Sequence, residues 1–336
     1  MSRVAPAVLF RRIAIAWLAA SGIAAAAPAV PAWSLLPQPV LARPAGSGAV
    51  EIADDAAVAV RGVDREEVQS IAKRLVQRLA DVRGLRLRMA ADAATHPAIT
   101  FEVDPHADVT GDAGYRITVD GQGIRVAART PRGAFYGSVT LWQLLTPPGW
   151  TRGAPVAVAD GVIDDHPRFA WRALLLDSGR HFQSVADIKR LIDWMSLGKL
   201  DVLLWHVTED QGWRLEIPRY PELTKTGACR QAVGTDGELT GSAGKPYCGY
   251  YTEAEVRDIV RYATERYVDV VPEIDLPGHS QAAIAAYPWL GVTGQRPPVW
   301  TDWGVSPWLL NPDGKTLRFV EDVLDVSRII AGKMRL

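Results

Sequence analysis

Three short segments decide the fold: RALLLDSGRHF at residues 172–182, KLDVLLWHVTEDQGW at residues 199–213 and VVPEIDLPGHS at residues 270–280. Each contains a brief apolar run, which is typical of a strand buried on both faces. Amphipathic helical patterns stand between them, opened by the cap motifs Ser-x-x-Asp at 184–187 and Thr-x-x-Glu at 252–255. Buried strands that alternate with such helices predict an α/β fold with parallel strands, either a (β/α) barrel or an open doubly wound sheet.

Polar side chains crowd the carboxyl ends of all three predicted strands, and they comprise carboxylates, imidazoles, an arginine and a tryptophan: Asp177, Arg180, His206, Glu209, Asp210, Trp213, Glu273, Asp275 and His279. Both α/β architectures place their sites at these strand ends. Arginine donates to two hydroxyls at once, and tryptophan stacks on a sugar ring. The combination predicts a site for a polyhydroxylated ligand, with close ionisable groups available for acid-base chemistry.

Simpler explanations apply to some of these residues taken singly. A single residue of this kind is more often a helix cap, a member of a buried ion pair or a core histidine, and we assign His206 and Asp210 to this structural group. A zinc site from His206, Glu209 and His279 is conceivable, but the short ligand spacings typical of zinc are missing. We therefore expect no metal ion and no cofactor.

The residues before these segments predict a small α+β domain. A helical pattern begins near Asp64, includes Val82 on its apolar face and stops at Gly84; a second begins at Thr130 and stops before Pro147. Strands are expected at residues 85–89, 99–103, 115–119 and 124–127. No acid, base or metal cluster stands out here, so we expect a structural role for residues 33–165, followed by the strand-helix units over 166–336.

The first 32 residues have the pattern of an export signal. Arg3, Arg11 and Arg12 precede an apolar run over residues 13–27, which small residues suited to cleavage follow. The run is short for a membrane-spanning helix, so a retained anchor is the less favoured alternative. We expect a signal peptide over residues 1–32 and an exported protein, either periplasmic or secreted.

Export makes the two cysteines interpretable. Cys229 and Cys248 flank a glycine-rich stretch without helical or strand periodicity. In an oxidising compartment a disulfide between them is the natural pairing, with two unpaired thiols as the alternative.

The composition excludes several classes of protein. The 336 residues carry 37 basic and 38 acidic side chains, for a formal net charge of -1, and 48% of them are hydrophobic. Apolar content of this size excludes a disordered or collagen-like chain. A nearly neutral chain has no broad attraction for phosphate backbones or anionic lipids, so nucleic acids and membrane surfaces are not expected as partners.

The three opening segments, together with GYRITV at 114–119 and ARTPRGAFYGSVTLWQLL at 128–145, resemble the β-N-acetylhexosaminidases of glycoside hydrolase family twenty. The resemblance extends over about residues 34–325. It implies a (β/α)₈ barrel preceded by an α+β domain. It also implies release of terminal β-linked N-acetylglucosamine or N-acetylgalactosamine from oligosaccharides or glycoconjugates, as substrates and partners.

The resemblance also implies roles for individual residues. Arg180 matches the arginine that holds the sugar's hydroxyls, and His279 matches a histidine in a hydrogen-bond relay toward the catalytic acid. Glu209, a second catalytic candidate, stands where many relatives have aspartate; the departure keeps the charge and lengthens the arm by one methylene. Supporting positions behind these residues are implied for three carboxylates: Asp177, Glu273 and Asp275.

The family's adjacent Asp-Glu pair has no match. In relatives this pair orients the substrate's acetamido group, which itself attacks the anomeric carbon, and protonates the leaving oxygen. The matching position would fall just beyond Leu336, so we expect a truncated barrel and an inactive chain. The alternatives are a noncatalytic sugar-binding fragment and a different barrel glycosidase, which would need a carboxylate pair elsewhere.

Overall fold

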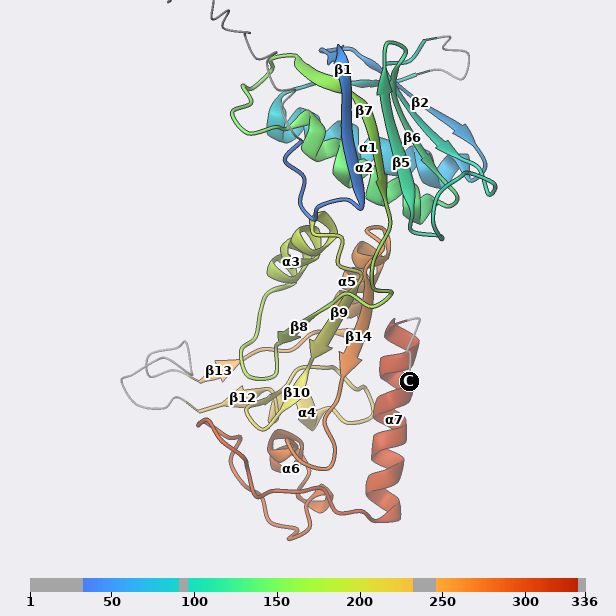
Figure 1. Ribbon diagram of the computed structural model, residues 1–336. Coiled ribbons are helices and arrows are strands. Elements are labelled where there is room, and N and C mark those ends of the chain that lie inside the picture. The colour runs from blue at the N-terminus through green and yellow to red at the C-terminus, as the bar shows by residue number, and fades with distance from the viewer. Residues whose placement is uncertain (1–32, 91–95, 232–245, 332–336) are drawn as a thin grey trace, which may run out of the picture.

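The computed structural model describes residues 33–90, 96–231 and 246–331. These ranges form an N-terminal unit built on one large sheet and, after it, a unit built on a short parallel sheet (Figure 1). The export signal expected over residues 1–32 lies outside the described residues. In the described part of the chain, no helix combines the length and apolarity that crossing a membrane would require.

The N-terminal unit is a seven-stranded mixed sheet in the order β1-β7-β5-β6-β4-β2-β3. Its strands are β1 (Leu41–Ile52), β2 (Ala57–Gly62), β3 (Arg88–Met89), β4 (Ile99–Val103), β5 (Tyr115–Asp120), β6 (Gly123–Ala128) and β7 (Val156–Asp165). Helices α1 (Arg65–Arg78) and α2 (Pro131–Leu145) pack on one face of this sheet (Figure 1). The α+β architecture is as expected.

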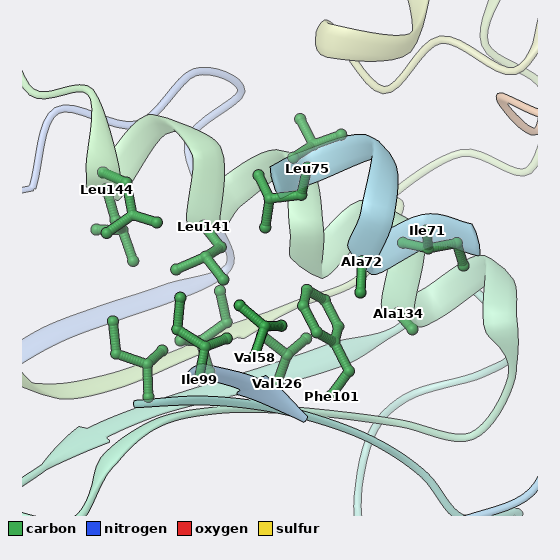
Figure 2. Close-up of a cluster of buried hydrophobic side chains, with 14 of the residues drawn as sticks. Val58, Ile71, Ala72, Leu75, Ile99, Phe101, Val126, Ala134, Leu141 and Leu144 are labelled. Carbon is green, nitrogen blue, oxygen red and sulfur yellow. The ribbon is translucent and has the colours of Figure 1, made fainter. Parts of the chain in front are cut away.

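Alternation along the strands explains which face the helices cover. In β4, Ile99 and Phe101 are fully buried while Thr100 between them is partly exposed. Figure 2 shows Phe101 pointing toward Ala72 of α1 and Ile99 toward Leu141 of α2, within one buried cluster. Apolar residues at three- and four-residue spacing on the helices and two-residue spacing on the strands thus converge on one core.

The strand expected over residues 85–89 is wrong in extent, because only β3 at its end pairs with a neighbour. The backbone N–H of Arg86 donates to Asp54 Oδ1 at 2.9 Å instead of to a strand. Leu85 and Leu87 are nevertheless buried, as their alternation suggested. A side-chain acceptor has replaced part of the ladder.

The expected burial of Val82 is also wrong. Helix α1 continues as the π-helical segment η1 (Leu79–Arg83). Its wider turn rotates the last residues about the helix axis, so that different side chains point toward the core. Val82 is 42% exposed, and Arg83 is buried in its place. Its Nη1 and Nη2 donate there to the carbonyl oxygens of Thr151 and Ala154, at 2.8 and 3.0 Å.

The second unit is built on three parallel strands, β8 (Ala173–Asp177), β9 (Val202–His206) and β14 (Asp269–Glu273), with β9 in the centre. Helix α3 (Val185–Leu197) connects β8 to β9, and α5 (Glu253–Thr264) leads into β14. The remaining elements are β10 (Thr208–Glu209), β11 (Gly212–Trp213), α4 (Glu222–Lys225), β12 (Cys229–Arg230), β13 (Tyr247–Cys248), α6 (Gln281–Ala286), η2 (Pro288–Leu290) and α7 (Gly314–Ala331). Both cap motifs open helices as expected, with a reciprocal capping box at Thr252 and Glu255.

The register of the parallel sheet brings the three strand ends together. Asp177 of β8 and Glu273 of β14 both stand beside His206 of β9. The residues that follow each strand therefore emerge at the same edge. At the opposite edge, the loops before the strands contact the N-terminal unit through Lys199, whose Nζ lies 2.7 Å from Asp165 Oδ2.

Candidate sugar-binding site

Arg180 is the organising residue at the carboxyl edge of the sheet. Its Nη1 donates to Asp177 Oδ2 at 2.6 Å, and its Nη2 donates to Glu209 Oε1. Burial disfavours the charged guanidinium, but these two carboxylates outweigh it and raise the pKa of Arg180. The side chain remains 28% exposed while Glu209 is 1% exposed, so a fixed cation faces outward over buried carboxylate.

The loop that carries Arg180 is held by two arginines that the sequence interpretation missed. Arg214, fully buried, donates to the carbonyl oxygens of Ser178 and Gly179, each at 3.0 Å. Arg230 donates to the carbonyl oxygen of Arg180 at 2.6 Å. Burial is the main cause that lowers the pKa of Arg214 to about 10, which still leaves it charged at neutral pH.

Gly179 allows this loop to lie against Glu209. A Cβ atom at residue 179 would come 2.8 Å from the Cβ of Glu209, closer than real contacts permit. The glycine therefore sets how near Arg180 approaches its carboxylate partner.

Glu209 is the buried acceptor at the centre of the cluster. Besides Arg180, it accepts from the backbone N–H of Asp210. Its Oε1 lies 3.8 Å from His206 Nε2 and 2.7 Å from His279 Nδ1. Burial would raise the pKa of Glu209, but these positive and donor groups together lower it, so the carboxylate is ionised at neutral pH.

His279 occupies an unusual backbone position. Its φ of 52° lies in the left-handed region, which costs free energy for a residue with a Cβ and is most often found at functional sites. Although Nδ1 is 2.7 Å from Glu209 Oε1, it is buried and not aligned for a hydrogen bond. The ring is 36% exposed, so His279 joins the buried carboxylate to the open side of the cluster.

His206, interpreted from the sequence as a core residue, lies inside the cluster. Its Nδ1 is 3.7 Å from Glu273 Oε1 and 4.0 Å from Asp275 Oδ1. Burial lowers the pKa of His206, but the surrounding carboxylates, Glu209 first, outweigh burial and raise it. Glu273 and Asp275 thus stand behind the imidazole, away from Arg180's hydrogen bonds.

Asp210 takes a capping position, as the sequence favoured. Its Oδ1 accepts from the backbone N–H of Gln281 at 2.9 Å, at the first residue of α6. Burial is the main cause that raises the pKa of Asp210, and the neighbouring charge of Glu209 adds to it.

Trp213 cannot supply the stacking surface that its position suggested. It is 4% exposed, and its Nε1 donates to the carbonyl oxygen of Leu215 at 2.7 Å. The exposed aromatic ring at the site is Trp303, which is 65% exposed and has Arg180 Cζ 5.8 Å from its ring centroid. Trp303 lies far beyond the third strand in sequence, and no spacing pattern singled it out.

Two sets of side chains come close enough to offer ligands to a metal ion: His206, Glu209 and Asp275, and Glu209, Asp210 and His279. Both sets depend on Glu209, whose Oε1 is already engaged by the Arg180 guanidinium. A cation there would be repelled by the fixed charge of Arg180. The geometry therefore favours hydrogen bonding over metal coordination, and we assign no metal to the site.

The expected disulfide between Cys229 and Cys248 is present. The two cysteines are paired partners in the β12-β13 ladder, where Arg230 faces Tyr247. The glycine-rich residues 232–245 between these strands lie outside the described residues. The bond fixes the strand from which Arg230 reaches the main chain of Arg180.

Comparison with known proteins agrees with this geometry. The sequence model of the glycosyl hydrolase family 20 catalytic domain matches residues 169–333, and that of the same family's domain 2 matches residues 32–166. The chain belongs to glycosyl hydrolase family 20. The parallel strands β8, β9 and β14 are accordingly part of a (β/α)₈-type catalytic domain, which excludes the doubly wound alternative.

The relatives within family 20 are named as β-hexosaminidases or a β-N-acetylglucosaminidase. A β-hexosaminidase of Porphyromonas gingivalis is 38% identical over 271 residues, covering 78% of this chain and 33% of the relative. The N-acetyl-β-hexosaminidase of Streptomyces plicatus, solved with Thio-NAglucal, superposes with a TM-score of 0.78 at 36% identity, covering 88% of this chain and 57% of that one. The exo β-N-acetylglucosaminidase of Vibrio harveyi, solved with N-acetylglucosamine, gives 0.74 at 28% identity, with coverages of 89% and 45%. The chain spans about a third of the length of the first curated relatives it matches.

Proposed function

We propose that this protein binds a terminal β-linked N-acetylglucosamine or N-acetylgalactosamine residue of an oligosaccharide or glycoconjugate, and that Arg180 holds the hydroxyls of that sugar. The observation that carries the proposal is the Arg180 guanidinium, fixed between Asp177 and Glu209 yet open to solvent. A planar cation held in this way can donate two parallel hydrogen bonds to vicinal hydroxyls. The activities of the family 20 relatives support the same ligand class.

The reaction we propose for the whole family 20 catalytic domain is exo-acting, substrate-assisted hydrolysis with retention. The acetamido oxygen of the sugar bonds to the anomeric carbon while the glycosidic bond breaks, and the leaving oxygen takes a proton from a carboxylic acid. In this chain Arg180 would orient the ring. Glu209 and His279 would form the start of a relay toward that acid.

The acid itself has no counterpart among these 336 residues. They contain no Asp-Glu dipeptide, and the reversed pairs at 209–210 and 321–322 lie in the cluster already described and in α7. We therefore propose that a polypeptide of these 336 residues binds the sugar without turning it over, which is also what a noncatalytic sugar-binding role predicts. A polypeptide that continues past Leu336 into an Asp-Glu pair should gain turnover.

The cellular setting is part of the same proposal. We propose export to the periplasm or the exterior with removal of residues 1–32, followed by an α+β domain over 33–165 and the catalytic part over 166–336. The disulfide between Cys229 and Cys248 supports an oxidising compartment, because such bonds persist there. Mass spectrometry of the mature N-terminus after expression in a Gram-negative host would test the cleavage.

Calorimetric titration with N-acetylglucosamine tests the sugar site. We expect saturable binding that Arg180→Ala weakens at least about tenfold, because hydrogen bonds from a charged donor contribute about 1.5–3 kcal/mol. Arg190→Ala is the matched control, since Arg190 is an exposed arginine of α3 paired with Asp187. It should leave the affinity unchanged.

A p-nitrophenyl N-acetylglucosaminide assay on the same proteins tests catalysis. We expect no release of p-nitrophenol above background from the 336-residue polypeptide. Turnover at ordinary enzyme rates would contradict the assignment of the missing acid. Absence of N-acetylglucosamine binding in the folded protein would contradict the role of Arg180.

A further inference from the structure

A second pocket lies where the two units meet, at the end of the parallel strands opposite Arg180. Its volume is about 330 Å³, within the size range of small-molecule sites. Residues of helices α1 and α2 of the N-terminal unit and of α3 of the second unit line it. Its apolar lining includes Ile71, Leu75, Phe135, Val139 and Leu197.

Hydrogen-bond donors without acceptors gather in this pocket. Arg74 and Arg78 line it one helical turn apart, and neither guanidinium makes a hydrogen bond or ion pair within the described residues. Arg74 Nε and Trp142 Nε1 are both buried without a partner. The Arg78 guanidinium lies over the Trp142 ring, 5.6 Å from its centroid.

The acceptors that line the pocket are already engaged. Asp193 Oδ1 accepts from Arg266 Nε at 2.6 Å, and Oδ2 accepts from the hydroxyl of Tyr262 at 2.9 Å. Asp81 Oδ1 accepts from Gln77 Nε2 at 2.8 Å. The pocket therefore carries an excess of donors and positive charge that its own carboxylates leave unsatisfied.

Burial makes the excess positive charge in the pocket more unfavourable. Burial is the main cause that lowers the pKa of Arg74 and of Arg78. The charge of Arg266 adds to it at both residues, and the charge of Asp193 opposes it at Arg78 without restoring the ordinary pKa. Partly buried cations that repel one another are destabilising unless an anion joins them. Such an arrangement is common where a protein receives an anionic ligand.

We propose that this pocket binds a small organic anion, with a carboxylate or phosphate head group held by Arg74 and Arg78 and an apolar body packed against Phe135 and Leu197. The Trp142 indole supplies a further donor to the head group. Because the ligand would touch both units, it would also strengthen their junction. This site is separate from the sugar site, which lies at the other end of the same strands.

Calorimetric titration of the full chain with phenyl phosphate and with benzoate tests the proposal and separates the two head groups. We expect at least one probe to bind saturably, and Arg74→Gln/Arg78→Gln to weaken it tenfold or more. Lys73→Gln is the control for loss of a positive charge from α1 outside the pocket, because Lys73 is exposed. Trp142→Phe keeps the ring and removes the donor, and should weaken binding by a smaller factor.

Two further measurements keep the test decisive. The double variant should unfold at the same or a higher urea concentration than the wild type, because it loses unpaired charge; a purely structural role for the arginines would lower that concentration. It should also retain N-acetylglucosamine binding. Absence of saturable binding of both probes up to about 10 mM, unchanged probe binding in the double variant, or an equal loss in Lys73→Gln would each overturn the proposal.

Discussion

The two ends of the three parallel strands carry similar charged residues but satisfy them differently. At the amino end, Lys199 Nζ donates to Tyr115 and Asp165, each at 2.7 Å, and Arg172 pairs with Asp201 at 2.9 Å. At the carboxyl end, buried polar atoms lack hydrogen-bond partners within the described residues: His206 Nε2, Asp210 Oδ2, Gln211 Oε1, Glu273 Oε2 and His279 Nδ1. Unpartnered buried groups cost stability, so those around Arg180 mark the carboxyl end for ligand chemistry, whereas the ion pairs of Lys199 and Arg172 at the amino end hold the units together.

The largest expected effect comes from removing an ion pair at the amino end of the strands. Lys199→Met leaves the Asp165 carboxylate, 12% exposed, without its cation at the junction of the units. Removing one partner of a buried ion pair typically costs about 3–5 kcal/mol, because the remaining charge stays buried. Urea unfolding followed by circular dichroism should show a loss of this size.

A matched variant separates burial from charge loss in that experiment. Lys189→Met removes an equally charged partner of Asp258, but this pair is more exposed, at 26% and 34%. We expect a loss below about 1 kcal/mol there. Equal losses in the two variants would contradict the distinction between a junction ion pair and a surface one.

The next largest effect comes from removing the disulfide near the carboxyl end of the strands. Cys229→Ser/Cys248→Ser removes a cross-link between residues 19 apart in sequence, which should cost about 3 kcal/mol in the chain-entropy account. Because Arg230 beside Cys229 donates to the carbonyl oxygen of Arg180, sugar affinity should fall as well. Urea unfolding and N-acetylglucosamine titration measure the two effects.

The same titration offers a control for the second effect. Arg230→Met keeps the disulfide and removes the hydrogen bond to Arg180, so it should weaken sugar binding with the cross-link intact. Full sugar affinity in both variants would show that the hairpin does not position Arg180.

Much of the parallel sheet was predictable from local patterns, whereas three of the seven strands of the N-terminal sheet were not. Apolar runs placed β8, β9 and β14 to within two residues, since strands buried on both faces have little else in them. The interpretation did not identify β1, β2 or β7. β1 contains a register shift between Pro44 and Ala49, which interrupts the alternation that marks a half-buried strand.

The site was predictable in its location but incompletely in its members. Strand ends identified Arg180, Glu209 and His279, because parallel strands in register deliver the following residues to one place. Local sequence could not show that Trp213 turns into the core, or that Trp303 arrives over Arg180 from a distant loop. Both facts depend on tertiary packing, which no single-strand pattern contains.

The smallest expected effect is on the pH dependence of stability, and it comes from His206 at the carboxyl end of the strands. Nearby carboxylates raise the pKa of His206 in the folded chain above its unfolded value of about 6.5. The charged ring therefore stabilises the fold fully below that pH, and the contribution is lost as pH rises through the raised pKa. We expect the unfolding free energy of the wild type to fall more steeply than that of His206→Gln as pH rises above about 6.5.

This result would distinguish the two ends by mechanism as well as by size. Lys199→Met should lower stability throughout the same pH range, because the buried Asp165 loses the cation that pairs with it. His206→Gln should change the slope instead, since only its loss alters the number of protons bound near neutral pH. Parallel curves for wild type and His206→Gln would show that the carboxylates Glu209, Glu273 and Asp275 do not hold a proton on the imidazole.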